Sequence, residues 1–98
     1  MVKRFGYRIE LGEIENALVA HDDVLEAALV AFPDASQGVR IVAFVTTRPG
    51  PRISLVAFKR HCARHIPRYM IPDRFKVLDA IPKTSTGKVA YRALEDLQ

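Results

Sequence analysis

The sequence contains a single cysteine, no tryptophan and no long run of apolar residues. Cys62 has no partner within the chain, which excludes an internal disulfide and favours a reducing, cytoplasmic compartment. No apolar segment approaches the roughly 20 residues that a membrane-spanning helix needs, and the first residues, M-V-K-R-F-G, lack the apolar core of a signal peptide. We therefore expect a soluble protein with no membrane partner.

The composition is that of an ordinary globular domain. The chain has 98 residues, of which 49% are hydrophobic and 27% are charged, and a chain of this length buries roughly 60 to 70% of the surface that it exposes when unfolded. We expect one domain over residues 1–98, with one modest core and no deep enclosed cavity. The net charge of +4 favours anionic partners without identifying one.

Hydrophobic periodicity predicts alternating helices and strands. Ile14, Ala17 and Leu18 recur at the three- and four-residue spacing of an amphipathic helix, and Ser54 is placed to cap a second helix. The predicted elements are a hairpin arm at 5–10, helices over 13–19, 54–66 and 89–97, and strands over 24–32, 39–47 and 74–78. This order predicts an α+β fold, in which a short N-terminal hairpin precedes a small, contiguous mixed sheet with helices packed against it.

The stretch P-K-T-S-T-G-K-V at residues 82–89 contains a glycine-lysine pair but is not a nucleotide-binding P-loop. That motif needs G-x-x-x-x-G-K-[ST], whereas Pro82 stands five positions before Gly87, and Val89 follows Lys88. What remains is a lysine at a loop-to-helix junction, beside a glycine and three hydroxyl side chains. Such an ammonium can offset negative charge on a phosphate or carboxylate during group transfer. The alternative is a solvated loop whose hydroxyls cap the last helix.

Two other clusters have simpler explanations. His61 and His65 have the i, i+4 spacing of two metal ligands, but no third ligand is evident nearby and Cys62 lies on the predicted apolar stripe, so we predict no metal site. A basic tract could bind a polyanion, but it has no clear aromatic stacking platform, which argues against nucleic acid. A solvated face, or a docking face for an acidic protein, fits better. The tract comprises Lys59, Arg60, Arg64, Arg68, Arg74 and Lys76.

Two longer segments carry a family resemblance. V-K-R-F-G-Y-R-I-E-L-G-E-I-E, at residues 2–15, and I-P-R-Y-M-I-P-D-R-F-K-V-L-D-A-I-P-K-T-S-T-G-K-V-A-Y-R-A-L, at 66–94, resemble the C-terminal subdomain of the adenylate-forming superfamily. This superfamily comprises acyl-CoA synthetases, adenylation domains of nonribosomal peptide synthetases, and luciferases. The motif G-Y-R-I-E-L-G-E-I-E, at residues 6–15, is similar to the corresponding motif in the branch of the superfamily that activates amino acids. The closing K-T-S-T-G-K-V-A-Y-R-A-L departs from that branch's commoner P-N-G-K-V-D-R-R-A-L, which leaves the acyl group open.

The resemblance implies a role for each end of the chain. Lys88 matches the lysine that bridges substrate and nucleotide oxygens during adenylation, with Thr86 and Gly87 beside it. Residues around Gly6 match the strand that lies beside the phosphopantetheine thiol in the second half-reaction. The binding residues implied at this strand are Lys3, Gly6, Tyr7 and Arg8.

The resemblance also implies what surrounds the chain. ATP and Mg²⁺ would be bound mainly by a larger N-terminal subdomain, which is not within these 98 residues, and the acceptor would be a phosphopantetheine thiol on an acyl or peptidyl carrier protein. The chain would then be a mobile lid that does not catalyse alone, with an amino acid as the expected substrate. The alternatives are the lid of an acyl-CoA ligase and a non-catalytic module that docks a carrier protein.

Overall fold

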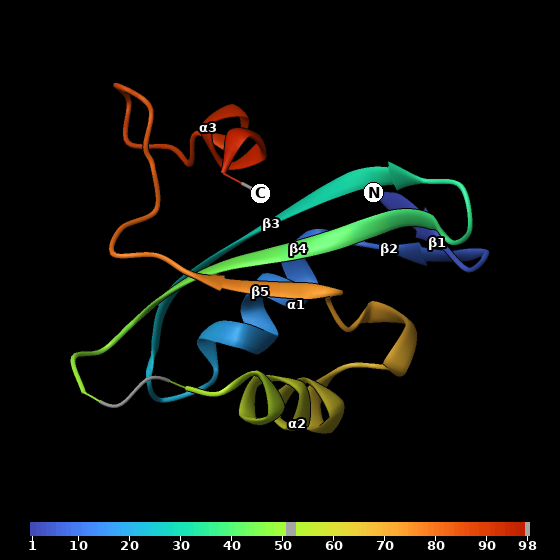
Figure 1. Ribbon diagram of the computed structural model, residues 1–98, viewed down its shortest axis with the longest axis horizontal. Helices are drawn as coiled ribbons and strands as arrows, with labels where there is room; N and C mark the ends of the chain where they lie inside the picture. The colour runs from blue at the N-terminus through green and yellow to red at the C-terminus, as the bar shows by residue number, and fades with distance from the viewer. Residues whose placement is uncertain (51–52, 98) are drawn as a thin grey trace.

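The computed structural model describes residues 1–50 and 53–97, and it has the predicted α+β architecture (Figure 1). A two-stranded hairpin comes first and is followed by helix α1, two long strands, helix α2, a short strand and helix α3. The elements are β1 (Val2–Arg4), β2 (Tyr7–Ile9), α1 (Leu11–Val19), β3 (Val24–Asp34), β4 (Gly38–Thr47), α2 (Leu55–His65), the 3₁₀ helix η1 (Arg68–Met70), β5 (Arg74–Val77) and α3 (Tyr91–Asp96). None of the helices in the described residues is long and apolar enough to cross a membrane.

The main sheet has the strand order β3-β4-β5 and is mixed, as predicted. β4 pairs antiparallel with β3 and parallel with β5. β3 ends at Asp34, two residues beyond the expected end. It can continue through Pro33 because β3 is an edge strand, where a missing N–H is tolerated. The Asp34 carboxylate then closes the turn, accepting hydrogen bonds from Ser36 N (2.9 Å), Ser36 Oγ (2.6 Å) and Gln37 N (3.2 Å).

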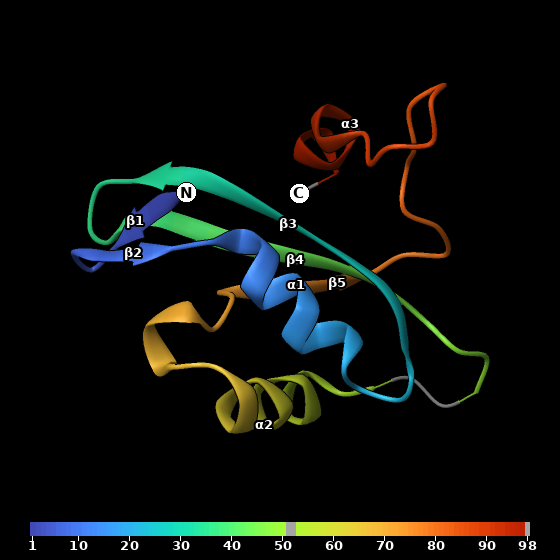
Figure 2. The same ribbon diagram turned by 180° about the vertical axis from the view of Figure 1, so that it is seen from behind.

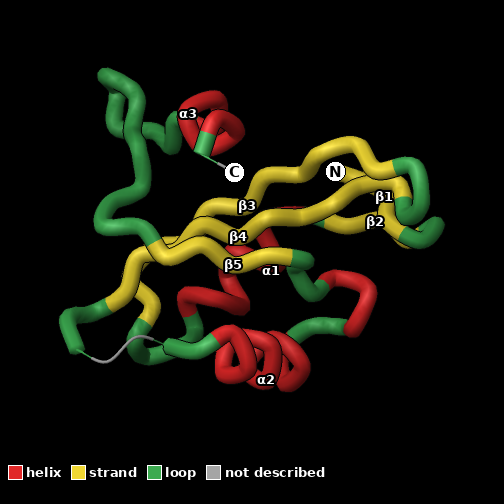
Figure 3. Tube along the Cα trace, in the orientation of Figure 1, coloured by secondary structure: helices red, strands yellow, loops and turns green. Residues whose placement is uncertain are grey.

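Helices cover both faces of this sheet. α1 and α2 pack on one face, and α3 lies on the other (Figures 2 and 3). Alternate residues of β4 therefore enter different cores: Ile41 and Val45 pack with α1 and α2, whereas Phe44 packs with Leu94 of α3. Two covered faces explain why residues 41–46 of β4 form a continuous buried run.

The N-terminal hairpin forms a two-stranded sheet of its own and precedes the contiguous mixed sheet, as predicted. β1 and β2 pair only with each other, around a two-residue turn in which Phe5 and Gly6 both have positive φ (52° and 80°), as in a type I′ turn. The hairpin contacts the main sheet at the β3–β4 turn, where Phe5 N donates to Gln37 O (2.8 Å). A Cβ at Gly38 would lie 2.6 Å from Lys3 O, so this close approach requires glycine.

The predicted helices exist, with shifted ends. α1 begins at Leu11, two residues early, and α3 is shorter than expected at six residues. Ser54 caps α2 as predicted, since its hydroxyl accepts from Ala57 N at 3.1 Å. The apolar stripe of α2 is buried at Phe58 and Cys62, whereas Leu55 is exposed because it stands in the first turn.

Candidate functional site at the two ends of the sheet

The loop that carries Lys88 is a compact hairpin. A bridge pairs Lys83 with Val89, Thr84 N donates to Lys88 O (2.7 Å), and Gly87 N donates to Thr84 O (3.0 Å). The Thr84 hydroxyl accepts from Lys88 N (3.2 Å), so the hydroxyls support this turn and not the start of α3, whose N-cap residue makes no side-chain cap. Gly87 has φ +85°, a conformation that favours glycine.

Both ends of this loop are fixed to the body of the domain. Ile81 and Leu94 are buried in the same core cluster, and Ala90 N donates to Pro82 O (2.9 Å). The Lys83 ammonium forms an ion pair with Glu26 at 2.6 Å. Lys88 itself is exposed, and no carboxylate of residues 1–50 or 53–97 lies within 4.0 Å of its ammonium. The fold therefore presents a free cation on a braced loop.

The second predicted group lies on the N-terminal hairpin. Lys3 and Arg8 stand opposite each other across the two strands, and both are exposed. Gly6 is at the tip, with no heavy atom within 4 Å of the place where a Cβ would stand. Tyr7 is 54% exposed and stacks on Tyr69 of η1, with ring centroids 4.0 Å apart and planes 10° from parallel.

Arg4 is a residue of this hairpin that the sequence analysis missed. Only 6% of it is exposed, and its guanidinium donates to Tyr69 O (3.1 Å), Ile71 O (2.5 Å) and Asp73 Oδ1 (2.6 Å). The sequence does contain a signal for it. Val2 and Arg4 alternate with Lys3 in a strand, so Arg4 shares the inward face with an apolar residue and needs buried acceptors there.

The two predicted groups lie at opposite ends of the β3–β4 ribbon (Figure 1). The hairpin contacts the turn between Asp34 and Gly38, whereas the Lys88 loop is tied to Glu26, near the start of β3. Asp34 is eight positions after Glu26 along β3, and eight steps correspond to about 26 Å at the usual rise per residue. The structure therefore does not bring Lys88 and Gly6 into one site.

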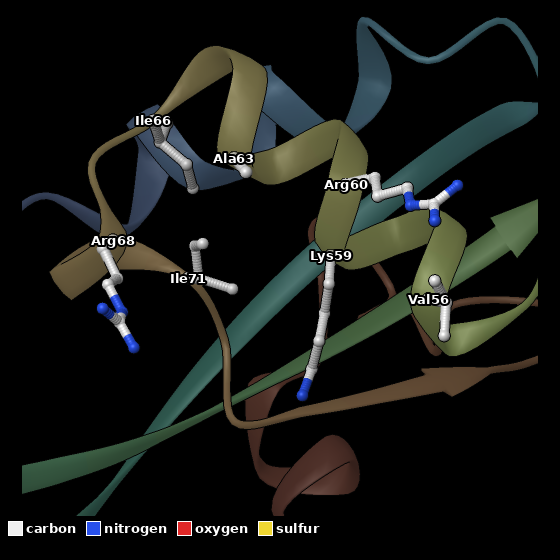
Figure 4. Close-up of a pocket in the computed structure, with 7 residues that line it drawn as sticks. All are labelled: Val56, Lys59, Arg60, Ala63, Ile66, Arg68 and Ile71. Atoms are coloured by element: carbon white, nitrogen blue, oxygen red, sulfur yellow. The ribbon is translucent and has the colours of Figure 1, made fainter.

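The basic tract is divided between two surfaces. Arg74 and Lys76 are on β5, and the Lys76 ammonium donates to Leu97 O (2.5 Å). Lys59, Arg60 and Arg68 border a groove of about 460 Å³ between α2 and the segment after it (Figure 4), whereas Arg64 lines a separate pocket beside His21 and His61. The groove is lined by Val56, Lys59, Arg60, Ala63, Ile66, Arg68 and Ile71. Its lining, among the residues that the structure describes, combines an apolar surface with three cations and no carboxylate.

The histidine pair makes contacts that explain it without a metal. The rings of His61 and His65 lie 4.3 Å apart, and His61 Nε2 is 2.6 Å from Ala17 O, a contact that uses one of the two nitrogens that could bind a metal. Cys62, which lies between the two histidines in the sequence, is buried. This burial raises the pKa of its thiol to about 11. In the described part of the chain, no three His, Cys, Asp or Glu side chains are grouped to hold a metal ion.

Glu15 connects three elements, a role that local sequence patterns did not predict. Its Oε2 atom accepts from Leu29 N of β3 (3.0 Å) and from the Tyr91 hydroxyl of α3 (3.4 Å). Partial burial, together with the Glu15 carboxylate, raises the pKa of Tyr91 above its usual value. These contacts give Glu15 a structural role, since they hold α3 against α1 and β3.

Comparisons with known sequences identify the family of this chain. Residues 13–88 match the family model described as the AMP-binding enzyme C-terminal domain. The chain is 42% identical over 94 residues to an L-proline–(L-prolyl-carrier protein) ligase of Streptomyces coelicolor, 40% identical over 97 residues to surfactin synthase subunit 1 of Bacillus subtilis, and 41% identical over 92 residues to an acetyl-coenzyme A synthetase of Deinococcus radiodurans. These matches cover 94 to 99% of this chain but only 18%, 3% and 14% of those proteins.

Solved structures show the same fold. An acyl-CoA synthetase of Brucella canis superposes with a TM-score of 0.86 at 29% identity, covering 100% of this chain and 20% of that one. The amide bond synthetase McbA of Marinactinospora thermotolerans, at 24% identity, shares the fold with a TM-score of 0.92 over 98% of this chain and 19% of its own. The family match spans most of the chain and the structural match all of it, so this chain belongs to the family of AMP-binding enzyme C-terminal domains, which are the C-terminal domains of adenylate-forming ligases.

Proposed function

We propose that this chain is the mobile lid of an ATP-dependent ligase that activates a carboxylic acid as its adenylate, with Lys88 as the adenylation lysine. The observation that carries the proposal is the exposed ammonium of Lys88, which has no carboxylate within 4.0 Å among residues 1–50 and 53–97 and stands on a loop that is braced at both ends. The neighbouring Lys83 does pair, with Glu26.

The proposed chemistry uses this cation as an electrostatic stabiliser. A substrate carboxylate oxygen attacks the α-phosphorus of ATP, an acyl–phosphate bond forms, and the bond from that phosphorus to the bridging oxygen of pyrophosphate breaks. Negative charge builds up on the attacking and leaving oxygens, and a positioned ammonium lowers the barrier by offsetting that charge. Thr86 would contribute a hydroxyl beside Lys88, and Gly87 would supply the positive-φ backbone conformation that shapes the loop. Mg²⁺ and most contacts to ATP would come from a larger N-terminal subdomain.

The second half-reaction would use the hairpin at the other end of the sheet. The thiol of a phosphopantetheine arm attacks the acyl carbon, a thioester forms and AMP leaves. Gly6 leaves open space at the hairpin tip for such an arm, and Tyr7 offers an exposed ring beside it. Lys3 and Arg8 are like charges directly across the strands, an arrangement that costs stability until an anion, such as a ligand phosphate, lies between them.

The distance between the two groups supports a lid that turns. Lys88 and the hairpin are held at opposite ends of one sheet, with about 26 Å of strand between their attachment points. One reaction centre cannot contact both at once. The lid would therefore present the Lys88 loop during adenylate formation and the hairpin during thioester formation.

An amino acid is the proposed substrate, and a carrier protein the proposed acceptor, in the cytoplasm. Support comes from the similarity to carrier-protein ligases and peptide synthetases. The similarity to an acetyl-coenzyme A synthetase is nearly as high. The alternative is therefore the lid of an acyl-CoA ligase, in which coenzyme A would supply the thiol.

The test uses the full-length enzyme that contains this chain. We expect Lys88→Ala to abolish most acid-dependent ATP–pyrophosphate exchange, while thioester formation from preformed adenylate largely survives. Arg92→Ala removes another exposed cation close in sequence and serves as the control, which should retain exchange. Exchange at the wild-type rate in Lys88→Ala would refute the proposal.

The groove beside α2 favours a second candidate function, a docking module for an acidic carrier protein. Apolar Ala63, Ile66 and Ile71 face one another there, and Lys59 and Arg68 extend beside them (Figure 4). An amphipathic helix with carboxylates would match both features. Binding of a carrier domain should weaken in Arg68→Glu but not in Arg92→Glu. Binding that is unaffected by Arg68→Glu would remove this candidate, whereas binding without any exchange activity would favour it over the first.

A further inference from the structure

We infer that Arg4 is a positioning residue for thioester formation: its buried guanidinium fixes the N-terminal hairpin to the body of the lid, so that the Gly6 tip moves with the lid as one unit. This inference rests on the proposed function, because it assigns Arg4 to the second of the two half-reactions.

Arg4 joins the hairpin to a segment far along the chain. Its Nη1 atom donates to two backbone carbonyls, Tyr69 O (3.1 Å) and Ile71 O (2.5 Å), and its Nη2 donates to Asp73 Oδ1 (2.6 Å). The planar, forked guanidinium can reach three acceptors at once, which a lysine ammonium in the same place cannot do with the same geometry. The side chain is 7% exposed, so water does not substitute readily for these partners.

Asp73 accepts hydrogen bonds from both Arg4 and the main sheet, and so links the two. Its Oδ2 atom accepts from the backbone N–H of Ile41 in β4 (2.7 Å), and both carboxylate oxygens lie 3.2 Å from Gln37 Nε2. Gln37 in turn accepts a hydrogen bond from Phe5 N, within the hairpin turn (2.8 Å). Arg4, Asp73 and Gln37 therefore close a loop of polar contacts that begins and ends at the hairpin.

This loop of contacts has a mechanical consequence. An isolated two-stranded hairpin is at best marginally stable in water, and β1 and β2 do not pair with any strand of the main sheet. Outside this network, Ile9 and Val2 anchor the base of the hairpin in the main core, whereas the part nearer the tip is held by the Tyr7–Tyr69 stack and the close contact at Gly38. Loss of the Arg4 contacts should therefore let the Gly6 tip move relative to the sheet.

The position of Arg4 predicts that its loss impairs one half-reaction and spares the other. Lys88 is anchored at the opposite end of the sheet, through Glu26, Ile81 and Leu94. Displacement of the hairpin should therefore impair the step that uses Gly6 and spare the step that uses Lys88. A residue that only stabilised the fold would affect both steps alike.

The experiment compares both half-reactions in the full-length enzyme carrying Arg4→Lys, Arg4→Gln or Asp73→Asn. We expect kcat/KM for the thiol acceptor to fall about tenfold to a hundredfold, because small misplacements of a positioning group cost this much. ATP–pyrophosphate exchange should stay within about twofold of wild type. Hydrogen exchange at residues 2–9 should accelerate in the same variants, while exchange at residues 82–89 should not.

Phe58→Leu is the matched control, because Phe58 is buried in the core, where it stacks on Phe75 of β5, and its side chain forms none of the hydrogen bonds of the Arg4–Asp73–Gln37 network. All variants are assayed at a temperature at which circular dichroism shows them folded, and Arg4→Lys, which keeps the charge, supplies the data if Arg4→Gln does not fold. Equal loss of both half-reactions, or a loss no greater than that in Phe58→Leu, would overturn the inference. If Lys88→Ala leaves exchange intact, the proposed function fails instead, so the two failures are distinguishable.

Discussion

The Lys83 ammonium lies 2.6 Å from Glu26 Oε1, and this ion pair joins the loop that carries Lys88 to the edge strand β3. Both side chains are partly exposed, at 37% and 48%. The pair links residues 57 positions apart and restrains the loop on the side away from α3. The position of Lys88 therefore depends on a carboxylate that no local sequence pattern connects with it.

Glu26→Gln should loosen the Lys88 loop without unfolding the domain. Exposed ion pairs contribute about 0.2 to 1 kcal/mol, so we expect ATP–pyrophosphate exchange in the full-length enzyme to fall by no more than about fivefold. Added salt should reduce the difference between variant and wild type, because it screens the pair. Glu13→Gln, another exposed carboxylate, is the control. A loss as large as that of Lys88→Ala would show that Glu26 does more than restrain the loop.

The variants Gly38→Ala and Gly6→Ala distinguish two reasons why a position requires glycine: a positive φ, and a lack of space for a side chain. Both residues have positive φ, which costs an alanine about 1 to 2 kcal/mol. At Gly6 the new methyl group meets open space, whereas at Gly38 it would lie 2.6 Å from Lys3 O. Urea denaturation should therefore show a larger loss of stability for Gly38→Ala than for Gly6→Ala. Equal losses would contradict the close approach of β1 to the β3–β4 turn.

Leu94→Ala should lower the free energy of unfolding, because it weakens the packing of α3 on the sheet. Leu94 is fully buried with Phe44 and Ile81, and removal of a buried leucine side chain costs about 2 to 5 kcal/mol. Leu97→Ala, at an exposed leucine just after the same helix, should cost less than about 1 kcal/mol. Thermal and urea unfolding of the two variants provide the comparison. Similar losses would mean that α3 does not pack as described.

Cys62 should be unreactive toward thiol reagents at pH 8 in the folded protein and reactive once the protein unfolds. Burial raises the pKa of its thiol to about 11, from an ordinary value near 9. The folded protein therefore holds Cys62 as the neutral thiol more strongly than the unfolded chain does. The free energy of unfolding should keep its full value below about pH 9 and should fall as the pH rises toward 11, where the unfolded chain loses the thiol proton first. Ellman's reagent, with and without urea, measures the first effect. Rapid labelling of the native protein would show that the core around α2 opens readily.

Local patterns predicted most of the fold. The three- and four-residue spacing of Ile14, Ala17 and Leu18 predicted α1, and Ser54 marked the start of α2. The ends of elements were less accurate, because long-range contacts set them. β3 passes through Pro33 because it is an edge strand, and its turn is closed by the Asp34 carboxylate.

The candidate site was predicted residue by residue but not as an arrangement. Lys88, Gly87, Thr86 and the hairpin residues were identified from the two motifs, and their roles remain proposals. Their separation at opposite ends of β3 and β4 could not be predicted, because it depends on how the hairpin and the last loop dock on the sheet.

The sequence by itself determined the α+β class, the order of elements, the cap of α2 and the two motifs, because these follow from spacing and residue type within short windows. The tertiary structure decided what holds the motifs in place. The Arg4–Asp73 pair spans 69 residues and the Lys83–Glu26 pair spans 57. Contacts at such separations are set only when the chain folds back on itself and buries an arginine beside its acceptors.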